Sequence, residues 1–241
     1  MSTPCPLNQA ENFKHNTLSF SNDSFQKLEL IMYKQKVEKD SYLYWEGDKA
    51  EKLYYLVSGT VRLTKMTDDG KDLSLYYFQP GDLFGEMDRS KDQVCTFSAE
   101  ALTECEVGVI QREDLESLLW QNGDVAIEFI SWMGHMQKFT QLKLRDLMFF
   151  GKNGALASTL IRMTNTFGEQ TGSKIVINKR FTNIEIASLI GSTRETVNRM
   201  LSQLKKDKAI DYKNGYLTIL NLEYLKEICH CEGCPASICR L

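Results

Sequence analysis

Four of the seven cysteines in this chain lie among its last thirteen residues, at spacings that could hold a metal. They are Cys229, Cys231, Cys234 and Cys239, and the last three form the pattern C-x2-C-x4-C. Cubane iron–sulfur clusters are held by such runs of thiolates. Structural zinc is the direct competitor, because Cys229, His230 and the other thiols offer enough ligands for a tetrahedral site. A redox-sensitive tail without any metal is the third interpretation.

A second candidate site has the pattern of a helix-turn-helix and occupies residues 181–210. Thr182, followed three residues later by Glu185, is a capping box that predicts the start of a helix. Gly191 can take a positive φ and end that helix, and Thr193 offers the next N-cap. In a helix-turn-helix the second helix enters the major groove of DNA.

The outward side of this second helix carries residue types that read bases. They are Arg194, Glu195, Asn198 and Arg199. Arginine pairs with guanine, and glutamate accepts from the cytosine amino group. Residues 179–213 hold eight basic and four acidic residues, so this segment has a net charge of +4 while the whole chain has −3. A helical hairpin with a solvated charged face is the structural alternative, but the coincidence of cap, turn, base readers and charge favours DNA binding.

Helices and strands must position these residues, and the residue pattern along the chain predicts where each kind of element lies. Residues 25–35 are spaced for a short helix, and residues 39–110 carry short β-branched and aromatic runs separated by turns, which is typical of a small β-barrel or jelly roll. Residues 112–148 have helical periodicity that Gly151 and Gly154 interrupt. That helix could pack on its own β-domain, pair with a second copy of the chain, or do both.

Together these motifs resemble the CRP/FNR superfamily of bacterial transcription regulators. The resemblance covers nearly the whole chain and is most specific in IGSTRETVNRMLSQLKKDKAI, while the Asn-Gly of residues 213–220 predicts the hairpin of a winged motif. It implies an α+β fold with an N-terminal cyclic-nucleotide-binding-like β-roll, a long dimerisation helix and a C-terminal winged helix-turn-helix. The expected parts are an N-terminal arm (1–24), a sensor-like β-roll (25–111), the dimerisation helix (112–150), the DNA-binding domain (151–226) and a cysteine-rich metal-binding tail (227–241).

The resemblance also implies partners. A homodimer would bind double-stranded DNA with a palindromic TGTGA-type site and work with RNA polymerase. Arg194, Glu195 and Arg199 would read the bases, and Thr182 and Thr193 would lie at the same interface. Asn198 departs from the small residue that is usual in the cyclic-AMP branch.

Cyclic-nucleotide binding is not expected in the β-roll. The family cassette pairs a glutamate with an arginine that forks onto the phosphate. Phe84-Gly85-Glu86 is present, but the arginine position falls on Cys95 and the next on Thr96. We therefore expect Glu86 to be a turn residue, and Cys95 and Cys105 to be plain buried thiols.

The tail resembles that of the Bacillus-type FNR regulators of anaerobic growth. By this resemblance one [4Fe–4S] cluster per subunit would be held by Cys231, Cys234, Cys239 and one aspartate, for which Asp146 is the matching residue. Cys229 is the alternative fourth ligand, and Asp146 could instead form an ion pair with Arg145, Lys143 or Lys152. The implied function is oxygen-responsive control of anaerobic metabolism. A zinc-dependent or thiol-redox-dependent regulator of the same family is the alternative.

Composition narrows the remaining function classes. The 241 residues are 42% hydrophobic, and no apolar run approaches the ~18 residues of a membrane span. The N-terminus lacks the order of a signal peptide, so a cytoplasmic protein without a membrane partner is expected. His15, His135 and His230 are scattered and no nucleophile–base pair is evident, so we do not expect an enzyme.

Overall fold

The computed structural model describes residues 15–87 and 94–241, which form two compact units. The first unit contains residues 15–66 and 75–137, and the second contains residues 67–74 and 138–241. The N-terminal Cys5 lies outside the described residues.

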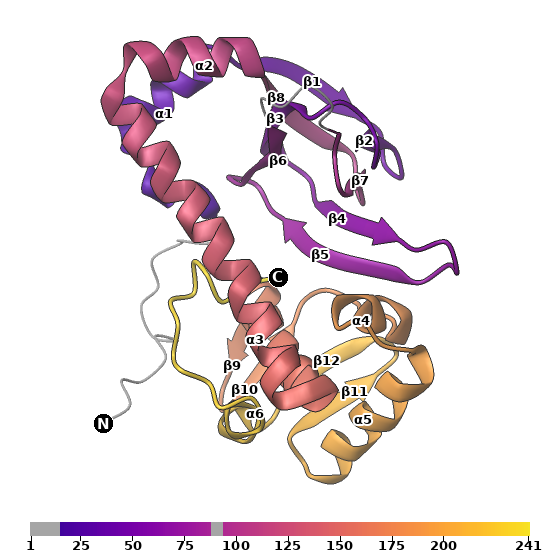
Figure 1. The fold of residues 1–241 in the computed structure, drawn as a ribbon. Coiled ribbons are helices and arrows are strands. Elements are labelled where there is room, and N and C mark those ends of the chain that lie inside the picture. The colour runs from indigo at the N-terminus through magenta and orange to yellow at the C-terminus, as the bar shows by residue number, and fades with distance from the viewer. Residues whose placement is uncertain (1–14, 88–93) are drawn as a thin grey trace. The chain divides into compact units, whose positions relative to one another are not determined.

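Two four-stranded sheets make up most of the first unit (Figure 1). Their strand orders are β1-β8-β3-β6 and β2-β7-β4-β5, and this arrangement confirms the expected β-roll. Turns fall at the predicted glycines, among them Gly47 and Gly81, whose φ angles are positive. The strands are β1 (Tyr33–Val37), β2 (Tyr42–Tyr44), β3 (Glu51–Ser58), β4 (Val61–Met66), β5 (Asp72–Phe78), β6 (Leu83–Met87), β7 (Ser98–Ala101) and β8 (Cys105–Gln111).

The helix expected over residues 25–35 is partly wrong. A 3-10 helix η1 (Asn16–Ser19) precedes helix α1 (Asn22–Glu29), which starts earlier because the Ser21 side chain caps it. Residues 33–37 form β1 instead, since they pair antiparallel with β8 along five positions. Long-range strand pairing has overridden a local helical spacing.

The long helical region begins as two helices. Helix α2 (Arg112–Gln121) ends at Asn122, which is extended, and α3 (Gly123–Phe167) begins at the next residue. Within α3 the backbone is non-helical at Gly151, with φ 58° and ψ −158°, so the break expected from the glycines is a kink rather than a loop. The first part of α3 buries Val125 and Trp132 in the core of the first unit.

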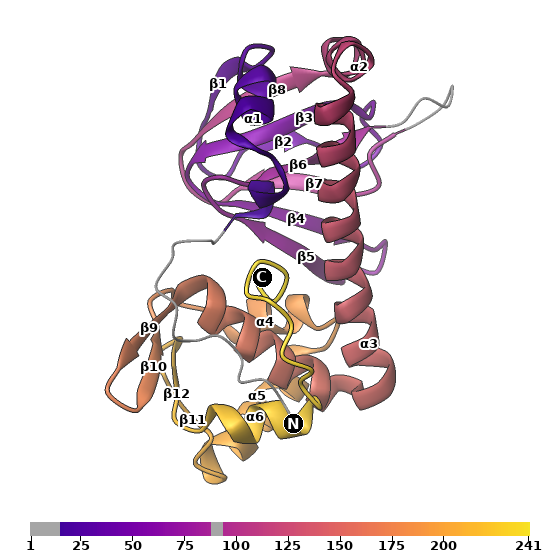
Figure 2. The ribbon, with the colours of Figure 1, turned by 90° about the vertical axis from the view of Figure 1, so that its left-hand side faces the viewer.

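The second unit contains a four-stranded sheet of order β11-β12-β10-β9 and three short helices after α3 (Figure 2). Strands β11 (Ile210–Lys213) and β12 (Tyr216–Ile219) form the wing, and their turn is the predicted Asn-Gly pair. Strand β9 (Gly168–Thr171) was not expected and pairs with β10 (Lys174–Ile177). Helix α6 (Leu222–Ile228) leads into the cysteine tail.

Helices α4 (Asn183–Leu189) and α5 (Arg194–Lys206) form the helix-turn-helix. The capping box is present: the Thr182 hydroxyl accepts from the Glu185 amide, and the Glu185 carboxylate accepts from the Thr182 amide. Gly191 has φ +57° between the helices, and the Thr193 side chain caps α5. Helix α5 buries Val197, Met200, Leu201 and Leu204, which fixes the face that it leaves exposed.

Candidate DNA-reading helix and cysteine site

The exposed face of α5 carries the four predicted base readers. Arg194, Glu195, Asn198 and Arg199 are all exposed, within the first two turns of the helix. Asn198 accepts a hydrogen bond of 3.3 Å from the side chain of Asn183 in α4. The helix N-terminus adds donors and a partial positive charge that suit phosphate. This face therefore has the chemistry to read a DNA groove.

The two threonines predicted beside the readers act as helix caps. Both side chains are exposed, yet each hydroxyl accepts from a backbone amide in the first turn of its helix: Glu185 for Thr182 and Thr196 for Thr193. Their hydroxyls thereby set the start of both helices of the motif.

The second candidate site surrounds a narrow cavity of about 20 Å³ in the second unit. The tail thiols and Asp146 line this same cavity, although Asp146 lies 83 positions before the first of these thiols in the sequence. Its lining residues are Leu142, Arg145, Asp146, Ser158, Ile161, Arg162, Cys229, Cys231, Glu232, Cys234 and Cys239. Cys229, the alternative fourth ligand, also lines this cavity.

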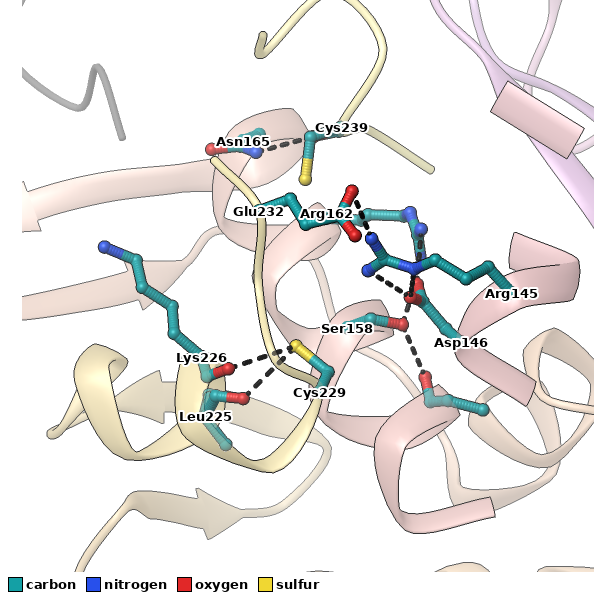
Figure 3. Close-up of polar contacts among 11 residues, drawn as sticks. Arg145, Asp146, Ser158, Arg162, Asn165, Leu225, Lys226, Cys229, Glu232 and Cys239 are labelled. Carbon is teal, nitrogen blue, oxygen red and sulfur yellow. Dashed lines mark hydrogen bonds and ion pairs between the residues drawn. The ribbon is translucent and has the colours of Figure 1, made fainter. Parts of the chain in front are cut away.

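Two arginines hold the Asp146 carboxylate (Figure 3). Asp146 is 1% exposed; its Oδ1 accepts from Arg145 Nη2 at 2.7 Å, and its Oδ2 accepts from Arg162 Nη2 at 2.7 Å. Arg162 also donates to the Ser158 hydroxyl at 2.8 Å. Of the expected ion-pair partners the structure shows Arg145, whereas Arg162 was missed.

The sequence contains a weak indication that Arg162 has a buried ionic partner. Arg162 lies within LASTLIRMTNTF, in which the residues around it are apolar or small, and it is 4% exposed. A charged residue inside such a helix face needs a buried partner. Its partner lies sixteen residues earlier, on the other side of the Gly151 kink, which helical periodicity cannot foresee.

The tail is fastened to both sides of the Gly151 kink. Before the kink, Arg145 Nη1 forms an ion pair of 2.6 Å with Glu232, and the His230 ring stacks on Phe150 with centroids 4.9 Å apart. Beyond the kink, the Asn165 side chain donates to the Cys239 carbonyl at 2.5 Å, and the Thr166 hydroxyl accepts from the Leu241 amide at 3.0 Å. The tail therefore contacts α3 on both sides of the kink.

The thiols differ in their surroundings. Burial raises the pKa of Cys229 to about 12, and its Sγ lies 3.4 Å from the Leu225 carbonyl. A hydrogen bond from Cys239 lowers the pKa of Cys234 to about 7 despite burial, with Arg162 and Arg145 contributing. The same hydrogen bond raises the pKa of Cys239.

The side chains around this cavity include several types of metal-binding donor. Among residues 15–87 and 94–241, no three His, Cys, Asp or Glu side chains lie close enough together to hold a metal ion. The donor types nevertheless fit, since thiols and one carboxylate face a common space. Metal binding would require these donors to move closer together around the metal.

The β-roll contains a larger and mostly apolar cavity of about 620 Å³. Glu86 lines it from strand β6 and is not a turn residue, which corrects the expectation. Its carboxylate accepts from the Thr96 amide and hydroxyl and from the Phe97 amide, because the chain before β7 folds back onto it. No lysine or arginine lines this cavity in the part of the chain that the structure describes. Cys95 and Cys105 are buried, and burial raises the pKa of Cys95 to about 11.

The β-roll, the long helix and the winged helix-turn-helix define a DNA-binding transcription regulator. A model of the cyclic nucleotide-binding domain matches residues 34–122, and a model of the Crp-like helix-turn-helix domain matches residues 154–228. The chain belongs to the CRP/FNR superfamily of transcription regulators. Members of this family bind DNA and are typically dimers, and they are regulators rather than enzymes.

Individual relatives support this assignment. The chain is 41% identical over 224 residues to the "Anaerobic regulatory protein" of Bacillus subtilis (strain 168), covering 92% of this chain and 94% of that protein. It is 30% identical over 157 residues to the "CRP-like cAMP-activated global transcriptional regulator" of Mycobacterium tuberculosis, covering 65% of this chain and 70% of that protein.

Solved structures support the fold. A CooA mutant from Carboxydothermus hydrogenoformans has a TM-score of 0.71 at 20% identity, covering 92% of this chain and 97% of that one. The regulator CLP of Xanthomonas campestris has a TM-score of 0.70 at 22% identity, covering 83% and 99%. None of the described helices is both long and apolar enough to cross a membrane.

Proposed function

We propose that this regulator responds to oxygen and controls anaerobic metabolism through one [4Fe–4S] cluster per subunit. Cys231, Cys234, Cys239 and Asp146 are its ligands, and Cys229 is the alternative to Asp146. The homodimer binds palindromic TGTGA-type sites through Arg194, Glu195, Asn198 and Arg199 of each subunit and acts with RNA polymerase.

One observation carries the proposal: a single cavity is lined by the tail thiols and by a buried aspartate from α3. Clusters are held by thiolate runs of this kind, and the Asp146 carboxylate adds an oxygen donor to the thiols that line the same cavity. The printed name of the Bacillus subtilis relative, an anaerobic regulatory protein, agrees with this function.

The bound cluster would supply a group that oxygen destroys, and the chain would convert that loss into a change of DNA affinity. Contacts between the tail and α3 lie on both sides of Gly151. Ligands from the tail and from Asp146 would hold this kink in one geometry. The two α5 helices of a dimer must lie about 34 Å apart to enter successive major grooves, so a fixed kink favours operator binding.

The test is purification without oxygen, followed by iron and acid-labile sulfide analysis. We expect a brown protein whose iron and sulfide are both lost in Cys234→Ala and Asp146→Ala. Cys105→Ala is the matched control, because Cys105 is a buried thiol of β8 that does not line the cavity. A colourless protein with stoichiometric zinc would contradict the proposal. A full cluster in Asp146→Ala, with loss in Cys229→Ala, would make Cys229 the fourth ligand.

A second candidate is a thiol-redox or zinc-dependent regulator, and the hydrogen bond between Cys239 and Cys234 favours its thiol form. These two thiols could form a disulfide when oxygen or a peroxide removes two electrons and two protons. Mass spectrometry of air-exposed protein distinguishes this case, because a Cys234–Cys239 disulfide would form in protein that never contained iron.

A further inference from the structure

The two arginines on Asp146 are not equivalent. Arg162 is 4% exposed, while the side chain of Arg145 is 21% exposed. Arg162 is held in place by the Ser158 hydroxyl, one helical turn away on the same helix. Arg145 has a second acidic partner, Glu232, whose side chain is 69% exposed.

This difference decides which ion pair can be given up. If Asp146 left Arg162, a guanidinium would be stranded in the interior with only a hydroxyl to accept from it. If Asp146 left Arg145, that guanidinium would still pair with Glu232 and would be partly hydrated. The two carboxylate oxygens serve different arginines, Oδ1 for Arg145 and Oδ2 for Arg162, so one can be released while the other is kept.

The tail strengthens the same distinction. Glu232 lies between Cys231 and Cys234, so Arg145 already joins the carboxylate to the loop that carries two of the thiols. Arg145 can therefore stay beside the thiol loop, on Glu232, when its bond to Asp146 is given up.

We propose that Arg162 is a positioning residue that keeps its hydrogen bond to Asp146 Oδ2 when the cluster binds, while Arg145 releases Oδ1 to iron and stays on Glu232. This inference rests on the proposed function. Arg162 orients the carboxylate as an outer-shell partner, and Arg145 competes with the cluster for Oδ1. Outer-shell partners of metal ligands commonly change metal affinity by about 10–100-fold.

The test compares Arg162→Met with Arg145→Met, which remove the same charge and the same kind of side chain from the same carboxylate. Anaerobic full-length protein is mixed with a ferrous chelator, and the rate of iron release is followed by absorbance. We expect Arg162→Met to release iron about tenfold faster than the wild type. Arg145→Met is expected to release iron at the wild-type rate or more slowly, because its Oδ1 competitor is gone.

Two further measurements separate positioning from simple destabilisation. Arg162→Lys keeps a cationic donor near Oδ2, so it should restore much of the wild-type release rate. The Mössbauer signal of the aspartate-bound iron should change in Arg162→Met and not in Arg145→Met. If Arg162→Met does not fold, Arg162→Lys and Arg162→Gln are compared, and faster release from Gln is expected.

Equal release rates from the two methionine variants, or faster release from Arg145→Met, would overturn the inference. In both cases the wild type still contains iron and sulfide, so the proposed function stands. Wild-type protein without iron and sulfide would instead remove the proposed function, and this inference with it.

Discussion

At the scale of single residues, the ion pairs of the buried Asp146 carboxylate contribute to the stability of the fold. A buried ion pair that loses one partner leaves an uncompensated charge, which costs about 3–5 kcal/mol. We therefore expect Arg162→Met to lower the free energy of unfolding of the cluster-free protein by about that amount. Arg145→Met should cost about 1 kcal/mol or less, because that arginine is partly exposed and screened. Urea unfolding of metal-free protein measures both, and equal losses would contradict this asymmetry.

The base-reading residues give a prediction of a different kind. Arg199→Ala should weaken binding to a TGTGA palindrome by about 1–3 kcal/mol per half-site and relax the base preference at one position. Lys206→Ala removes an exposed charge near the far end of α5 and should weaken binding to all sequences alike. Fluorescence anisotropy with a specific and a scrambled duplex compares them. An equal loss on both duplexes for Arg199→Ala would show that this residue contacts phosphate only.

At the scale of elements, the start of α4 depends on one hydroxyl. Thr182→Ala removes the acceptor of the Glu185 amide and should destabilise the protein by about 1 kcal/mol. Thr182→Ser keeps the capping oxygen and is the control. Thermal unfolding followed by circular dichroism measures the difference. If Ala and Ser behave alike, the capping box does not contribute to stability.

The kink in α3 depends on a glycine. Gly151 has φ 58° and ψ −158°, a region that costs other residues about 1–3 kcal/mol. Gly151→Ala should therefore destabilise the protein or straighten the helix, and in both cases weaken operator binding. Gly134→Ala is the control, since Gly134 is an ordinary helical position of α3 with open space around it. That change should stabilise slightly, and a similar outcome for both variants would show that the kink is not required.

The features that the sequence predicts correctly depend on residues that lie close together in the chain. The capping box at Thr182, the Gly191 turn and the Asn-Gly wing are written within a few neighbouring residues, and all three are present. The helix predicted over residues 25–35 is wrong for the start of β1, because that strand depends on pairing with β8, about seventy residues away. Likewise, the tail spacing suggested a metal and Asp146 was chosen by resemblance, but the Arg162 partner depends on how α3 folds at Gly151.

At the scale of the whole molecule, the helix-turn-helix and the cysteine tail lie in one structural unit. The same unit contains the part of helix α3 from residue 138 onward. Removing residues 229–241 should leave the helix-turn-helix folded, because its core is made by α4, α5 and the sheet. It should abolish oxygen-dependent binding while leaving weak, salt-sensitive binding to any duplex. Titration of DNA at two salt concentrations measures this. Oxygen-sensitive, operator-specific binding by the truncated chain would contradict a role for the tail.

Control of this regulator by a cluster is tested by measuring operator binding and cluster content in the same sample, before and after exposure to air. We expect about four iron and four sulfide per chain without oxygen, together with tight binding to the TGTGA palindrome. After air exposure, the iron, the sulfide and the operator affinity should be lost in parallel. Operator affinity that is unchanged while iron and sulfide disappear would contradict the claim that a cluster on the tail controls this regulator.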